Sequence, residues 1–240
     1  MSQDSPEPVA VAILAKAPIV GTVKTRLAML LGVDGATALQ ERFTRRAVER
    51  AVAAGVGPVT LWCSPDEGHP FFQTLAAEFP LALQRQPAGD LGARMLAAFV
   101  QAQRPTLVIG TDCPALTVAH LQTAAAVLRN GSDAVVFPAE DGGYVLIGLK
   151  APQPDLFSAM AWSTDAVMTE TRRRLTHIGL SWREPAQLWD VDRPSDVRRM
   201  RLEGFGDLLD GIGREPRPPE RFGFPWEPPD APPDGSSKPT

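Results

Sequence analysis

Apolar and polar positions follow one another along the chain in blocks that predict strands and helices in turn. Short apolar runs predict buried strands, and longer segments with apolar residues every three or four positions predict amphipathic helices. The predicted strands are 9–15, 58–63, 81–86, 106–110, 133–139 and 143–149; the predicted helices are 36–55, 69–79, 91–103, 118–130, 164–179 and a short one after Asp196. This alternation predicts the α/β class: a Rossmann-like, mostly parallel sheet with helices on both faces.

The chain of 240 residues is expected to form one domain over residues 1–210. From Gly211 onward the sequence is dense in proline, glycine and charge, and its apolar residues have no period. Such a composition cannot bury a core of its own, so residues 211–240 are predicted to be a disordered or loosely docked tail.

Composition narrows the class of partner. Apolar residues make up 44% and charged residues 22% of the chain, as in an ordinary globular protein, and the net charge is -4. A net negative charge argues against general affinity for nucleic acid or anionic membranes. The N-terminus lacks the pattern of a signal peptide, and no apolar stretch has the ~20 residues of a membrane helix. We therefore expect a cytoplasmic protein with Cys63 and Cys113 as buried, reduced thiols.

The stretch "APIVGTVKTRLA" at 17–28 contains Gly-x-x-Lys-Thr but is not a phosphate-binding P-loop. A P-loop requires a glycine directly before the lysine, and Val23 precedes Lys24 here. What remains is a loop after the first strand, shaped by Gly21, that carries the cations Lys16, Lys24 and Arg26.

Ligands of parallel α/β sheets bind beyond the carboxyl ends of the strands, where these cations stand. Arginine and lysine there suit a di- or triphosphate, and positive charge at a helix N-terminus favours a compensating anion. The alternative is a solvated basic start of a helix.

Four carboxylates are further candidates for the site. Asp112 comes directly after the strand 106–110 and is either a helix cap or a ligand of Mg²⁺ or Mn²⁺. Asp141 precedes two glycines in a predicted hairpin turn and could meet a hydroxyl group of a ligand. Asp190 and Asp192 alternate on an extended segment, which predicts that one faces the site and the other caps the following helix.

The segment "GDLGARM" at 89–95 follows the third strand and opens a helix. Asp90 and Arg94 could contact a base, a sugar or a phosphate there, and the alternative for Asp90 is an ordinary N-cap.

Six segments in order along the chain carry a resemblance: 15–28, 89–95, 109–117, 140–149, 162–171 and 190–196. Together they resemble the DUF2064 group of glycosyltransferase-A-like proteins, related to nucleotide-diphospho-sugar transferases and to phospholactate guanylyltransferase. The resemblance runs from Val9 to Glu203 and does not include the proline-rich tail. It implies a Rossmann-like sheet that binds a nucleotide over its first half, with a divalent metal on the diphosphate.

The resemblance also implies roles for particular residues. Lys24 and Arg26 would hold phosphates, and Asp192 resembles the second metal-binding aspartate of sugar nucleotidyltransferases. Asp112 would stand in for the metal-binding aspartate of the related Asp-x-Asp motif, of which this chain has only the last aspartate. The turn at 140–144 would face the sugar or the acceptor.

The first functional hypothesis is therefore glycosyl transfer from a nucleotide sugar to a small-molecule acceptor. The metal on Asp112 and Asp192, with Lys24 and Arg26, would stabilise the departing nucleoside diphosphate, and Asp141 would accept the proton of the acceptor hydroxyl. A nucleotidyltransferase that releases pyrophosphate would use the same cations and metal, and a nucleotide-binding protein without catalysis is the third alternative.

Overall fold

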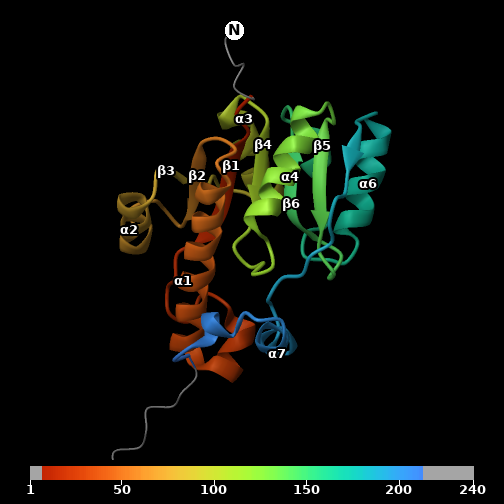
Figure 1. Ribbon diagram of the computed structural model, residues 1–240. Coiled ribbons are helices and arrows are strands. Elements are labelled where there is room, and N and C mark those ends of the chain that lie inside the picture. Colours follow the sequence, from red (N-terminus) through yellow and green to blue (C-terminus); the bar gives the residue numbers. More distant parts are fainter. Residues whose placement is uncertain (1–6, 213–240) are drawn as a thin grey trace, which may run out of the picture.

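The computed structural model describes residues 7–212 and confirms the α/β fold class. One sheet of seven strands has the order β3-β2-β1-β4-β6-β5-β7 (Figure 1). The strands are β1 Ala10–Lys16, β2 Val59–Ser64, β3 Leu81–Arg85, β4 Thr106–Ile109, β5 Ala134–Pro138, β6 Tyr144–Leu149 and β7 Trp182–Arg183. Neighbouring strands pair in parallel except β6, which runs antiparallel to both β4 and β5. The predicted tail lies outside the described residues from position 213 on.

Helices cover both faces of the sheet, as the sequence predicts. They are α1 Ala28–Ala54, α2 Pro70–Glu78, α3 Leu91–Ala102, α4 Val118–Arg129, α5 Pro154–Phe157, α6 Val167–His177 and α7 Pro194–Leu202, with short 3₁₀ turns at Thr25–Leu27 and Gly206–Leu209. Because side chains alternate along a strand, Val11 and Ile13 of β1 join an apolar cluster with α1, α2 and α4. Ala12 between them joins a second cluster with α3, α5 and α6.

A third apolar cluster lies at one end of the molecule, where α7 and the first turns of α1 are side by side (Figure 1). Leu27 and Leu31 pack there with Val191, Val197 and Met200 among others. The predicted helix start at residue 36 is wrong, because α1 begins at Ala28 and continues across a kink at Gly32, whose φ is 72°. The contacts of this early turn are with residues near the other end of the chain, which local periodicity does not show.

The turn between β5 and β6 is the tight hairpin that its two glycines predict. Ala139 and Gly143 share a backbone hydrogen bond of 3.0 Å, and Gly142 has a φ of +93°. The carbonyl oxygen of Gly142 accepts a 2.8 Å hydrogen bond from the N–H of Met168, so the hairpin turn is fixed to the start of α6.

None of the helices in residues 7–212 combines the length and the apolar character that a bilayer span requires.

Candidate functional site

A cavity of about 550 Å³ lies at the carboxyl edge of the sheet, the position that the α/β rule predicts. Its wall is built from the ends of β1 and β4, the start of β6, the loop 22–26, the start of α3 and the segment around 190–192. It brings together most of the predicted site residues: Lys16, Lys24, Arg26, Arg94, Asp112 and Asp192. Cations and carboxylates alternate on the cavity wall, because Lys24 forms an ion pair with Asp112 and Arg26 forms one with Asp192.

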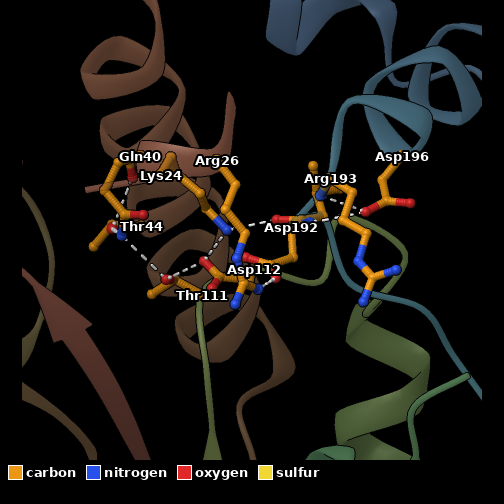
Figure 2. Close-up of polar contacts among 10 residues, drawn as sticks. Lys24, Arg26, Gln40, Thr44, Thr111, Asp112, Asp192, Arg193 and Asp196 are labelled. Atoms are coloured by element: carbon orange, nitrogen blue, oxygen red, sulfur yellow. Dashed lines mark hydrogen bonds and ion pairs between the residues drawn. The ribbon is translucent and has the colours of Figure 1, made fainter. Parts of the chain in front are cut away.

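The side chain of Lys24 is buried and connects its own loop to the loops that carry Asp112 and Val191 (Figure 2). Its backbone is in the left-handed region, with a φ of 48°, and its side chain is only 4% exposed. The ammonium lies 2.9 Å from Oδ1 of Asp112 and donates a 2.6 Å hydrogen bond to the carbonyl oxygen of Val191. It also lies 5.4 Å from the centre of the Phe43 ring. Two of the three N–H donors of this ammonium are thus used within the protein.

Arg26 is the open cation of the same loop. Its side chain is 68% exposed and forms an ion pair with Asp192, which is 48% exposed (Figure 2). Exposed pairs of this kind are worth little to stability, so a phosphate can compete for the guanidinium at small cost.

The segment that carries Asp190 and Asp192 differs from the prediction. Asp196 caps α7, because its Oδ2 accepts hydrogen bonds from the backbone N–H of Asp192 (3.0 Å) and of Arg193 (2.7 Å). The expectation that Asp190 or Asp192 caps the helix is wrong, since both line the cavity. Side chains alternate in a regular strand, whereas residues 189–192 are irregular, so the period of two does not apply.

Asp190 lies in a strongly negative environment. Burial, followed by the nearby carboxylates of Asp141 and Asp112, raises the pKa of Asp190 to about 6. A backbone hydrogen bond of 2.9 Å from Val191 to the carbonyl of Asp112 holds the two segments together. The backbone therefore holds the segment 190–192 close to Asp112.

Three predicted site residues do not line the cavity wall. Asp90 is the N-cap of α3, with its Oδ1 2.8 Å from the backbone nitrogen of Ala93, which is the structural alternative for this residue. Gly21 has a φ of +77° and shapes the loop. Asp141 accepts a 2.9 Å hydrogen bond from the backbone of Gly143, so it stabilises the hairpin turn beside the cavity.

The structure also adds polar residues that sequence reasoning missed. Gln86 lines the cavity and donates hydrogen bonds to the carbonyls of Ala15 (3.0 Å) and Trp62 (2.8 Å), while its oxygen accepts one from Arg94 (3.3 Å). Gln40 lines the cavity from α1. Its signal in the sequence is an amide among the apolar positions that recur on one face of the helix.

A divalent metal ion fits the chemistry of Asp112 and Asp192 only together with ligands from elsewhere. Within residues 7–212, no three His, Cys, Asp or Glu side chains are grouped so that they could hold a metal by themselves. Both aspartates are oxygen donors on the cavity wall. Mg²⁺ commonly takes one or two carboxylates and completes its shell with substrate phosphates and water. The donor set suits a metal that arrives with a phosphorylated ligand.

Solved structures share this architecture. A crystal structure from Desulfovibrio desulfuricans G20, described as a "putative nucleotide-diphospho-sugar transferase", has a TM-score of 0.71 and 25% identity, covering 84% of this chain and 96% of that chain. A 4-diphosphocytidyl-2C-methyl-D-erythritol synthase from Anaerococcus prevotii DSM 20548 has a TM-score of 0.55 and 8% identity, over 82% and 98%. A CMP:2-keto-3-deoxy-manno-octonic acid synthetase complexed with CTP has a TM-score of 0.51 and 12% identity, over 83% and 99%. The fold is thus of the nucleotide-diphospho-sugar transferase type.

The family is indicated by sequence as well. Residues 47–164 match the model of the family described as "Uncharacterized protein conserved in bacteria (DUF2064)", which confirms the resemblance to that family. No curated protein matches the chain by sequence.

Proposed function

We propose that this protein is a metal-dependent glycosyltransferase that uses a nucleotide-diphospho-sugar as its donor. The observation that carries the proposal is the composition of one cavity, in which the cations Lys16, Arg26 and Arg94 share the wall with the carboxylates Asp112 and Asp192. Cations suit the diphosphate, and paired carboxylates suit a metal bound to it. The description of the D. desulfuricans protein, which is 25% identical, supports the same class of donor.

The loop 22–26 would bind the donor's diphosphate. Arg26 offers an exposed guanidinium that can bind two phosphate oxygens, and Lys24, which keeps its contacts with Asp112 and Val191, would add a nearby positive charge. A divalent ion, Mg²⁺ or Mn²⁺, held by Asp112 and Asp192 would neutralise charge on the departing diphosphate.

The transfer itself requires a proton acceptor. The acceptor's hydroxyl oxygen forms a bond to the anomeric carbon, and the bond from that carbon to the β-phosphate oxygen breaks, with its electron pair leaving on the nucleoside diphosphate. The hydroxyl proton goes to a carboxylate. Asp141 is the residue predicted for this role, and Asp190 is the carboxylate of the cavity wall that is not assigned to the metal.

Nucleotidyl transfer is the second candidate, favoured by one observation. Among the solved structures with a similar fold are cytidylyltransferases, one of them complexed with CTP. In that reaction a substrate phosphate attacks the α-phosphate of a nucleoside triphosphate and pyrophosphate leaves. The two reactions differ in product, a nucleoside diphosphate in the first and pyrophosphate in the second.

The test is a melting-temperature panel with UDP, GDP, UDP-glucose, GDP-mannose, CTP and GTP, each with and without Mn²⁺ or Mg²⁺. A ligand at ~100 times its Kd adds ~2.7 kcal/mol of stability, which raises Tm by about 5–11 °C for a chain of this size. Metal-dependent stabilisation by a diphosphate or its sugar supports the first candidate, and stabilisation by triphosphates alone supports the second. No shift with any ligand would contradict a nucleotide site.

Matched variants then locate the chemistry. D112N and D192N should abolish the metal-dependent part of the shift, whereas D155N, which changes an exposed aspartate of α5 outside the cavity, should leave it intact. Once an acceptor has been identified, comparison of D190N with D141N in a product assay separates the two proposed proton acceptors: the essential one loses turnover and keeps donor affinity.

A further inference from the structure

A chain of buried polar groups leads from α1 to Asp112 (Figure 2). Gln40 is 5% exposed, Thr111 is 8% exposed and Thr44 is fully buried. The amide nitrogen of Gln40 lies 3.3 Å from the hydroxyl oxygen of Thr44 and 3.3 Å from that of Thr111. The hydroxyl of Thr111 in turn lies 3.1 Å from Oδ1 of Asp112. Polar groups so deeply buried need every hydrogen bond that they can make.

The number of available protons allows only one pattern of donors and acceptors among these buried groups. The main-chain carbonyl oxygen of Gln40 can only accept a hydrogen bond, so the Thr44 hydroxyl donates to it at 2.9 Å. A carboxylate can also only accept, so the Thr111 hydroxyl donates to Asp112. Each hydroxyl has thereby used its proton and can only accept a further hydrogen bond. The side-chain NH₂ group of Gln40 donates one hydrogen bond to each of them. A reversed amide would place its oxygen against two oxygens without a proton between them.

These hydrogen bonds fix one carboxylate oxygen of Asp112. Its Oδ1 receives the Thr111 hydroxyl and, at 2.9 Å, the ammonium of Lys24. Among the described residues, the side-chain hydrogen bonds of Asp112 involve Oδ1 and not its other carboxylate oxygen, and the side chain is 48% exposed on the cavity wall. One oxygen is therefore anchored to the protein while the other remains available to a ligand.

We infer that Gln40 and Thr111 are positioning residues, which act through a two-step hydrogen-bond relay to hold the carboxylate of Asp112 toward the cavity. The relay itself stands on the contacts above; its use in holding a metal–nucleotide complex rests on the proposed function. Residues that orient a metal ligand commonly change metal affinity 10–100-fold when they are replaced.

The experiment is calorimetric titration of the full-length protein with UDP and with GDP in Mn²⁺, comparing wild type with T111V, T111S and Q40M. T44V is the matched control, because it removes an equally buried hydroxyl from the other side of the same amide without touching Asp112. Folding of each variant is checked by urea unfolding. The relay predicts a loss of roughly tenfold or more in Mn²⁺-dependent affinity for T111V and Q40M, while T111S and T44V stay within about twofold of wild type.

Equal affinities for T111V and T44V would overturn the relay. If wild-type protein binds neither nucleotide with Mn²⁺, the proposed function fails, and crystal structures of T111V and T44V still decide the relay. The relay predicts that the Asp112 side chain leaves its position in T111V and keeps it in T44V. An unmoved Asp112 in T111V would overturn it.

Discussion

Replacing Gly142 tests the packing of the hairpin turn against the residues just before α6. A Cβ atom at this position would lie 2.3 Å from the carbonyl oxygen and 2.5 Å from the Cα of Asp165, and these are backbone atoms that cannot turn aside. The φ of +93° adds strain for any residue with a side chain. We expect about 1–3 kcal/mol from overpacking and about 1–2 kcal/mol from the backbone, so that G142A lowers the free energy of unfolding by about 2–5 kcal/mol.

Gly143 provides the control in the same turn. A Cβ there would meet only the carboxylate oxygen of Asp141, at 3.3 Å, and that side chain can move. Urea unfolding followed by tryptophan fluorescence should therefore show a loss below about 1 kcal/mol for G143A. For a chain of this size, the G142A loss corresponds to a Tm lower by about 4–20 °C. A G142A protein as stable as G143A would refute the close approach of the turn to Asp165.

Three further predictions concern charged and thiol groups. K24M should lower the free energy of unfolding by about 1–3 kcal/mol, because it strips a donor from buried partners, whereas R26M should cost less than about 1 kcal/mol because its ion pair is exposed; urea unfolding measures both. Hydrogen bonds from Arg173 and Arg174 lower the pKa of Glu170 to about 2, so the contribution of Glu170 to stability is complete above the unfolded pKa of about 4.3 and is lost as the pH falls toward 2. The Tm difference between wild type and E170Q should accordingly shrink from pH 6 to pH 2.5. Burial raises the pKa of Cys63 and of Cys113 to about 12, so at pH 8 only about 10⁻⁴ of each is thiolate, and iodoacetamide should label the native protein far more slowly than the urea-unfolded chain.

Each of these has a clear contrary result. Equal losses for K24M and R26M would mean that burial does not distinguish the two cations. If the Tm difference between wild type and E170Q does not depend on pH, the ion pairs of Glu170 are not its cause. Labelling of Cys113 at the rate of a small-molecule thiol would show that its place on the cavity wall leaves it open to reagents.

Most of the sheet could be predicted from sequence, because strands buried on both faces appear as uninterrupted apolar runs between amphipathic helices. The reversed direction of β6 follows from the two-glycine turn, which is long enough only for a hairpin. The first turns of α1 could not be predicted. Gly32 interrupts the helical pattern, and the partners that stabilise Leu31 lie in α7 and the segment before it.

The candidate site likewise has features that could be predicted from the sequence and features that could not. That Asp112 lies at the edge of the sheet where ligands of α/β proteins bind could be predicted, because it directly follows an apolar strand. The burial of Lys24 could not be predicted, since its partners come from an irregular segment far along the chain. Asp196 takes the capping role expected of Asp190 or Asp192, because backbone geometry and not residue type decides which carboxylate reaches the free N–H groups.

The wide separation of these partners also bears on when the site comes into being during synthesis. Lys24 meets Val191 across 167 positions, and the loop that carries Arg26 meets Asp192 at almost the same separation. A nascent chain that has emerged only as far as β6 already contains β1–β6 and the helices α1–α4, but not the last carboxylates. Until the segment 188–196 has left the ribosome, the loop 22–26 has half of its counter-charges, so the cavity that we propose as a nucleotide site should be one of the last parts of the molecule to be completed.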